Sequence, residues 1–99
     1  MRLITSAGAS RDLDDIYDYS FKQWGGGQAE LYVASFGDIF AKLLALLANP
    51  AIGGRADDVR PGYCRMPHRS HIIFYQVGDD TLTIVRVLHQ RMDIREHLG

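Results

Sequence analysis

Residues 72–88, IIFYQVGDDTLTIVRVL, decide the fold of this 99-residue chain. They contain two runs of β-branched and aromatic residues, Ile72–Val77 and Leu82–Leu88, separated by Gly78, Asp79 and Asp80. Two such runs around a short polar turn that contains glycine are typical of a β-hairpin. The sequence therefore predicts that the second half of the chain forms the centre of an antiparallel sheet.

Both faces of the first of these strands are apolar. Side chains alternate between the faces of a strand, so Ile73, Tyr75 and Val77 share one face while Ile72 and Phe74 share the other. Strands with two apolar faces are usually central in a sheet. We expect helices to cover one face and either another segment or a partner to cover the other.

The segment before this hairpin has helical periodicity. A first helix is predicted up to the glycines at 25–27, with Ser6 or Ser10 as its N-cap. Three consecutive glycines are expected to end it. A second helix is predicted from Gln28 to Ala48, ended by Asn49 and Pro50. Four aromatic residues of these helices are expected to lie in the core or at its edge: Tyr17, Tyr19, Trp24 and Tyr32. Any of them that are exposed would contribute to a partner interface.

Shorter elements complete the pattern. Arg2–Thr5 and Tyr63–Met66 are predicted strands, Ala51–Pro61 is a predicted loop, and Asp93–Leu98 is a predicted final helical turn. The order is then β-α-α-β-β-β. We predict an α+β fold, in which an antiparallel helical hairpin packs on a mainly antiparallel four-stranded sheet.

Length and composition set further limits. A chain of 99 residues forms one domain over residues 1–99, and 46% hydrophobic residues suffice for a core. The lone Cys64 has no disulfide partner, and the N-terminus lacks the pattern of a secretory signal. The apolar stretch Ile39–Ala48 is about half the ~20 residues that a membrane-spanning helix needs. We expect a soluble protein of the cytoplasm.

The net charge of −1 hides an asymmetry along the chain. Residues 1–58 carry five Lys and Arg against eight Asp and Glu, whereas residues 59–99 carry six Arg against four acids. Proteins that bind nucleic acid through its phosphates are usually basic overall. We therefore expect no direct sequence-specific binding to nucleic acid, and a protein partner with an acidic face stays possible.

The best candidates for partner binding lie in the second half of the chain: Arg60, Tyr63, Arg65, Arg86, His89 and Arg91. The arginines could converge on one face and pair with carboxylates of a partner, or be separate solvated charges. His89 could act as a general base, but the partners of a catalytic histidine are not evident in the sequence. A structural role, bonding a backbone carbonyl where the chain leaves its strand, is the preferred interpretation.

Neither a metal nor a cofactor is expected. The four histidines are spread over residues 68–97, and no tight cluster of His, Cys and acidic residues accompanies them. The glycines at 25–27 follow a predicted helix and lack the Lys-Ser/Thr of a phosphate-binding loop. We interpret them as a turn.

Five blocks of residues, in this order, resemble the ParE branch of the ParE/RelE toxin superfamily. They are Asp12-Leu13 with Ile16, Tyr17, Tyr19 and Trp24-Gly25; Gln28-Ala29 with Tyr32; Asn49-Pro50 with Ile52-Gly53; Arg60-Pro61-Gly62-Tyr63; and Ser70-His71 with Ile73-Phe74-Tyr75 and Val85–Asp93. The resemblance implies a type II toxin that poisons DNA gyrase by binding. It also implies a ParD-like antitoxin, whose C-terminal segment wraps the toxin in a hetero-oligomer.

Two other functions stay open. The RelE branch has the same fold but cuts messenger RNA on the ribosome, which requires a base, an acid and cations. Arg60, Arg65, Arg86, His89 and Arg91 could supply an acid and cations, but a base is hard to find apart from Glu96. The third possibility is a chain that has lost toxicity and only binds an antitoxin.

Overall fold

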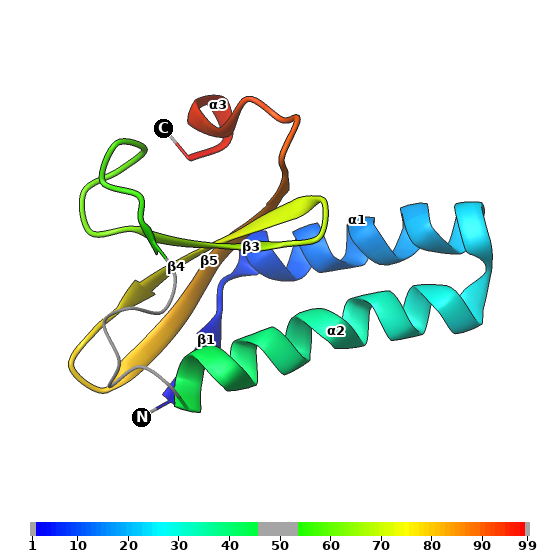
Figure 1. Cartoon of the computed structure of the whole chain (residues 1–99), viewed down its shortest axis with the longest axis horizontal. Coiled ribbons are helices and arrows are strands. Elements are labelled where there is room, and N and C mark those ends of the chain that lie inside the picture. The colour runs from blue at the N-terminus through cyan, green and yellow to red at the C-terminus, as the bar shows by residue number, and fades with distance from the viewer. Residues whose placement is uncertain (1, 46–53, 99) are drawn as a thin grey trace.

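The computed structural model describes residues 2–45 and 54–98. Strand β1 (Arg2–Thr5) leads into the long helices α1 (Ala7–Trp24) and α2 (Gly26–Ala45). The strands β2 (Gly54–Arg55), β3 (Cys64–His68), β4 (His71–Val77) and β5 (Thr81–His89) follow, and the short helix α3 (Ile94–Leu98) comes last. Figure 1 shows the α1–α2 hairpin along one face of the sheet and α3 on the other.

The sheet has the strand order β1-β5-β4-β3-β2. Strand β1 runs parallel to β5, and the other pairs are antiparallel. The predicted α+β class with a helical hairpin on a mainly antiparallel sheet is confirmed. The sheet has five strands where four were predicted. The fifth is Gly54–Arg55, which lies in the segment predicted to be a loop and pairs with the start of β3.

Two separate apolar clusters lie on the two faces of the sheet. Between the sheet and the hairpin, Ile73 and Tyr75 pack with residues of both long helices. On the opposite face, Phe74 and the partly buried Ile72 pack with Tyr63, Leu88 and Leu98, the last from α3. The predicted division of β4 into two apolar faces is thus confirmed for these four residues of the strand, whereas Val77 is exposed.

The turn between the helices needs only one of the three glycines. Gly25 has a φ of 89°, a left-handed conformation that glycine adopts without steric cost, and its amide caps α1 by donating to the carbonyl of Phe21. Gly26 and Gly27 form the first turn of α2, so the prediction that all three glycines lie outside the helices is wrong. The predicted end of the second helix, at 48–50, lies outside the described residues.

The hairpin reaches well past the sheet (Figure 1). Tyr19 and Trp24 lie on this projecting part, and their side chains are 63% and 61% exposed. The prediction that they lie in the core or at its edge is therefore wrong, because the helix continues beyond the sheet that would cover them. No helix among residues 2–45 and 54–98 is both long and apolar enough to cross a membrane.

Candidate partner-binding surface

Helix α1 completes the edge of β5 where β1 stops pairing with it. Strand β1 matches β5 only from Thr81 to Ile84, and the polar backbone groups beyond would be unpaired. The Ser6 amide donates to Ile84 O at 3.0 Å, and its hydroxyl donates to Val85 O at 2.6 Å. Ser6 Oγ also accepts from the Ala9 amide at 3.0 Å, which makes Ser6 the N-cap of α1.

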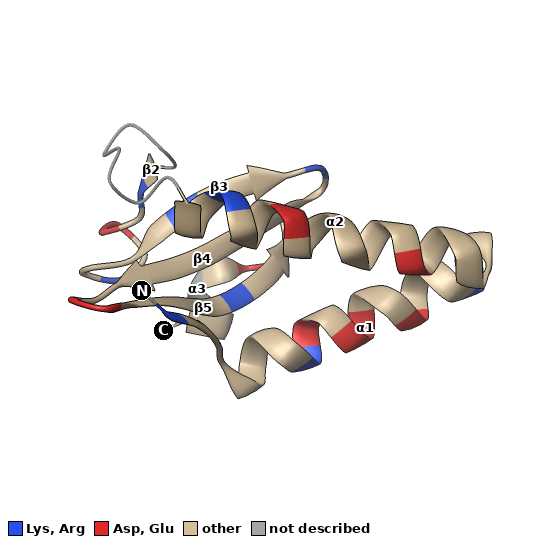
Figure 2. Cartoon of the chain, turned by 90° about the horizontal axis from the view of Figure 1, so that it is seen from below, with Lys and Arg blue, Asp and Glu red and all other residues tan. Residues whose placement is uncertain are grey.

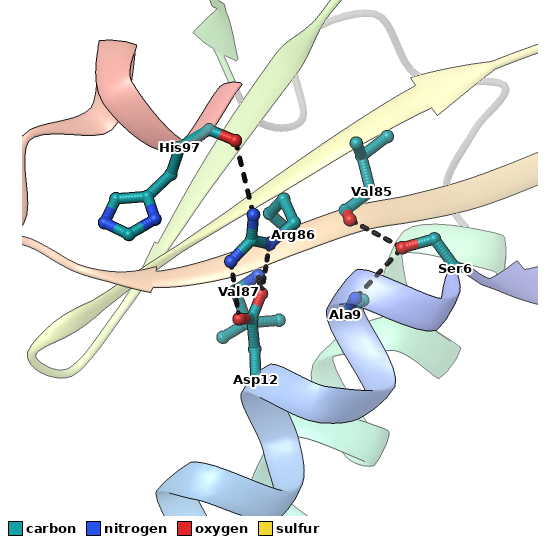
Figure 3. Close-up of polar contacts among 7 residues, drawn as sticks. All are labelled: Ser6, Ala9, Asp12, Val85, Arg86, Val87 and His97. Carbon is teal, nitrogen blue, oxygen red and sulfur yellow. Dashed lines mark hydrogen bonds and ion pairs between the residues drawn. The ribbon is translucent and has the colours of Figure 1, made fainter. Parts of the chain in front are cut away.

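Asp12 continues this edge with a buried carboxylate. Its Oδ2 accepts from the Val87 amide at 2.8 Å and from Arg86 Nε at 2.7 Å, and its Oδ1 accepts from Arg86 Nη2 at 2.8 Å (Figure 3). The two side chains are 10% and 24% exposed. Hydrogen bonding to Asp12 raises the pKa of Arg86, so this guanidinium stays charged. The two parallel hydrogen bonds between the Arg86 guanidinium and the Asp12 carboxylate make a rigid link between α1 and β5.

Two of the predicted arginines hold α3 on the sheet. Arg86 Nη1 donates to His97 O at 3.3 Å, and Arg60 Nη1 donates to Leu98 O at 3.3 Å. Positive groups at the C-terminus of a helix bind the carbonyls that the helix leaves unpaired. The guanidinium of Arg60 also lies 6.0 Å from the ring centre of Tyr63, which is itself buried under α3.

The other predicted site residues lie apart from these. Arg65 forms an ion pair with Asp58. His89 ends β5, and its Nδ1 accepts from the Arg91 amide at 3.1 Å, whereas the expected partner was a carbonyl. The structure therefore divides the six predicted residues into three groups. Arg60, Tyr63 and Arg86 surround α3, Arg65 pairs on its own, and His89 lies with the exposed Arg91 where the chain leaves β5.

A groove lies between the helical hairpin and the ends of β4 and β5. Its first pocket, of about 530 Å³, is lined by Asp12, Asp15, Ile16, Tyr19, Ser20, Trp24, Tyr32, Ser70, His71, Val87, His89 and Met92. A second pocket, of about 490 Å³, is lined by Trp24, Gln28, Leu31, Tyr32, Arg69 and Ser70. Because the pockets share Trp24, Tyr32 and Ser70, they form one groove. Of the six predicted residues, this groove contains only His89.

Two histidines on adjacent strands, and a tyrosine of α2 that contacts one of them, line the groove on the side of the sheet. His71 pairs with His89 across β4 and β5, and their ring centres are 5.2 Å apart. The Tyr32 hydroxyl shares a hydrogen bond of 2.9 Å with His71 Nδ1. Burial, followed by the neighbouring His89 and His68, lowers the pKa of His71 to about 4. The His71 ring is therefore neutral at pH 7.

We expect the stability of the protein to fall as His71 is forced to take up a proton. Its folded-state pKa lies below the ordinary 6.5, so the native state resists protonation and loses stability as the pH falls from 6.5 to 4. Full linkage would be worth ~3 kcal/mol, and partial solvent access reduces this to about 1 to 2 kcal/mol. Urea unfolding measures the free energy of unfolding at pH 7.5 and at pH 4.5. The drop between the two pH values should be about 1 to 2 kcal/mol larger for the native sequence than for His71→Gln. Identical losses would contradict this assignment.

Sequence reasoning missed most of the groove because its residues come from distant segments. Asp12 and Ser20 lie on α1, Tyr32 lies on α2 and His71 lies on β4, and no spacing in the sequence shows that these three elements meet. The histidines do approach one another, since His68 pairs with His71 and His71 with His89. Within residues 2–45 and 54–98, however, no group of three His, Cys, Asp or Glu side chains is placed to hold a metal ion.

Known proteins of one family match this chain. Residues 3–94 match the family described as the ParE toxin of a type II toxin–antitoxin system, parDE. Toxin ParE1 of Mycobacterium tuberculosis (strain H37Rv) is 40% identical over 98 residues, which cover 98% of this chain and 97% of the relative. Toxin ParE1 of Caulobacter vibrioides is 40% identical over 94 residues, which cover 95% and 94%.

A solved structure agrees with these relatives. A chain of the chromosomal ParDE toxin–antitoxin system from P. aeruginosa superposes with a TM-score of 0.72 at 25% identity, covering 90% of this chain and 95% of the other. The family match and the relatives at 40% identity extend over nearly the whole sequence, and the fold agrees with the solved structure. The chain belongs to the ParE toxin family of type II toxin–antitoxin systems.

Proposed function

We propose that this ParE toxin acts in the cytoplasm by binding DNA gyrase and trapping it on cleaved DNA, and that a ParD-like antitoxin holds it inactive. The groove carries the antitoxin part of this proposal. Its rim presents four large apolar side chains to solvent: Tyr19, Trp24, Leu31 and Met92. Large exposed apolar side chains around a concave surface are typical of a protein-binding site.

The arginine contacts favour action by binding over cleavage of RNA. Arg86 is bonded to Asp12 and to the His97 carbonyl, Arg60 is bonded to the Leu98 carbonyl, and Arg65 is paired with Asp58. An RNA-cleaving site needs cations directed at the phosphate whose charge grows in the transition state. Three of the four candidate arginines are thus directed at groups of the protein itself, and two of them hold α3 in place, whereas Arg91 is exposed beside His89.

A supercoiling assay with purified gyrase tests the function. We expect the isolated protein to inhibit supercoiling and to accumulate linear, cleaved DNA, and we expect added antitoxin to reverse both effects. The antitoxin alone serves as the control, and a ribosome-dependent assay of messenger RNA cleavage runs in parallel. Intact supercoiling with cut message would replace the proposal with RelE-like cleavage. No effect in either assay would contradict toxicity and favour a module that only binds its antitoxin.

A further inference from the structure

The first pocket of the groove has walls that suit a positive charge. Tyr19, Trp24 and Tyr32 line it; the first two are largely exposed, whereas the guanidinium of Arg69 already lies 5.8 Å from the ring centre of Tyr32. The faces of aromatic rings attract cations, and a guanidinium group also stacks on them. Ile16, Val87 and Met92 add apolar surface that would suit the aliphatic part of a long side chain.

The charged side chains that line this pocket are acidic. Its lining among the described residues contains Asp12 and Asp15 but neither lysine nor arginine. Arg86 neutralises Asp12, so Asp15, which lies exposed on α1, supplies the uncompensated negative charge. Figure 2 shows further acidic positions along the same helix. His71 is neutral at pH 7 and would not repel a cation.

Ser20 gives independent evidence that a polar group enters this pocket. Ser20 is 1% exposed, and its Oγ has no hydrogen-bond partner in the part of the chain that the structure describes. A buried hydroxyl without a partner is costly and rare in native proteins. Ser20 lines the pocket, and because its Oγ is buried, a donor would pair with the hydroxyl where the entering side chain displaces part of the pocket wall.

We propose that this pocket receives one arginine or lysine side chain of the protein partner that occupies the groove. The stem of that side chain would lie against Ile16 and Met92, and its cationic end would lie between Asp15 and Ser20, with the ring of Trp24 farther along the same wall of the pocket. The partner is the antitoxin if the function proposed above holds. The second pocket contains Arg69 in place of an acid, so the two ends of the groove select opposite charges.

Fluorescence can test the pocket directly, because Trp24 is the one tryptophan of the chain. The probe is N-acetyl-arginine amide, and the matched control is N-acetyl-citrulline amide, which has nearly the same shape but no charge. We expect the arginine probe to quench Trp24 at millimolar concentrations and the citrulline probe to bind about fivefold more weakly or worse. Equal binding of the two probes, or no binding of the arginine probe, would overturn the proposal.

Variants of single residues test whether the arginine probe binds in this pocket. Asp15→Asn should weaken the arginine probe about threefold to fivefold, and Ser20→Ala about threefold. Asp14→Asn removes a neighbouring exposed acid that does not line the pocket and should change nothing. Equal losses in Asp14→Asn and Asp15→Asn would show a general charge effect and contradict the assignment.

An experiment on the purified complex with the antitoxin shows whether the pocket receives a side chain of the partner or only a free small cation. If the partner fills the pocket, Trp24 in the complex should no longer respond to the arginine probe. A response as strong as that of the free protein would show that the pocket stays open and would overturn its assignment to a partner side chain. The gyrase assay does not depend on this result, so a failure here and a failure of the proposed function are distinguishable.

Discussion

Replacing Asp12 by alanine is expected to lower the free energy of unfolding by about 3 kcal/mol, one of the two largest effects we anticipate. The carboxylate accepts three hydrogen bonds, two from Arg86 and one from the Val87 amide. Its loss leaves a guanidinium that is only 24% exposed without its counter-charge and a buried amide without its acceptor. Urea unfolding followed by far-UV circular dichroism would measure the change.

Two further variants make this result specific. Asp14→Ala removes an exposed acid from the same helix and should change stability by no more than about 0.5 kcal/mol. Replacing both partners, Asp12→Leu with Arg86→Met, should recover much of the loss, since an apolar pair avoids burying an uncompensated charge. A loss below about 1 kcal/mol in Asp12→Ala would contradict the stabilising role of the ion pair.

The parts of the fold that were predictable are those that local pattern determines. The alternation of Ile72 to Tyr75 predicts two buried faces, and the structure places two apolar clusters there. The polar turn at 78–80 predicts the hairpin that joins β4 to β5. Both features depend on neighbours within a few residues, and periodicity in the sequence records such neighbours directly.

The groove and the edge contacts depend on the tertiary structure. Asp12 and Arg86 are 74 positions apart. Helical spacing places Asp12, unlike Asp14, on the face of Ile16 and Ser20, but it does not show that this carboxylate meets Arg86 at the open edge of β5. Trp24 follows the helical stripe of buried residues but lies beyond the end of the sheet. Periodicity shows which face of a helix is apolar, but it does not show how far the covering sheet extends.

The second large effect is expected from Trp24→Ala, which should weaken antitoxin binding by about 30-fold or more. Trp24 lines both pockets of the groove, and a tryptophan in such a position commonly supplies about 2 kcal/mol or more of an interface's binding energy. Its side chain is 61% exposed in the free protein, so stability should change by no more than about 0.5 kcal/mol. Isothermal titration of each variant with purified antitoxin measures the affinity, and urea unfolding measures the stability.

Phe21 provides the matched control for this experiment. It is another large aromatic residue of α1, 53% exposed, and it lines neither pocket. If antitoxin occupies the groove, Phe21→Ala should retain affinity to within about threefold while Trp24→Ala does not. Equal losses in the two variants would indicate that the antitoxin binds the exposed tip of the hairpin in general. An unchanged affinity in Trp24→Ala would place the antitoxin on another surface, and the face of the sheet that carries α3 would be the next to test.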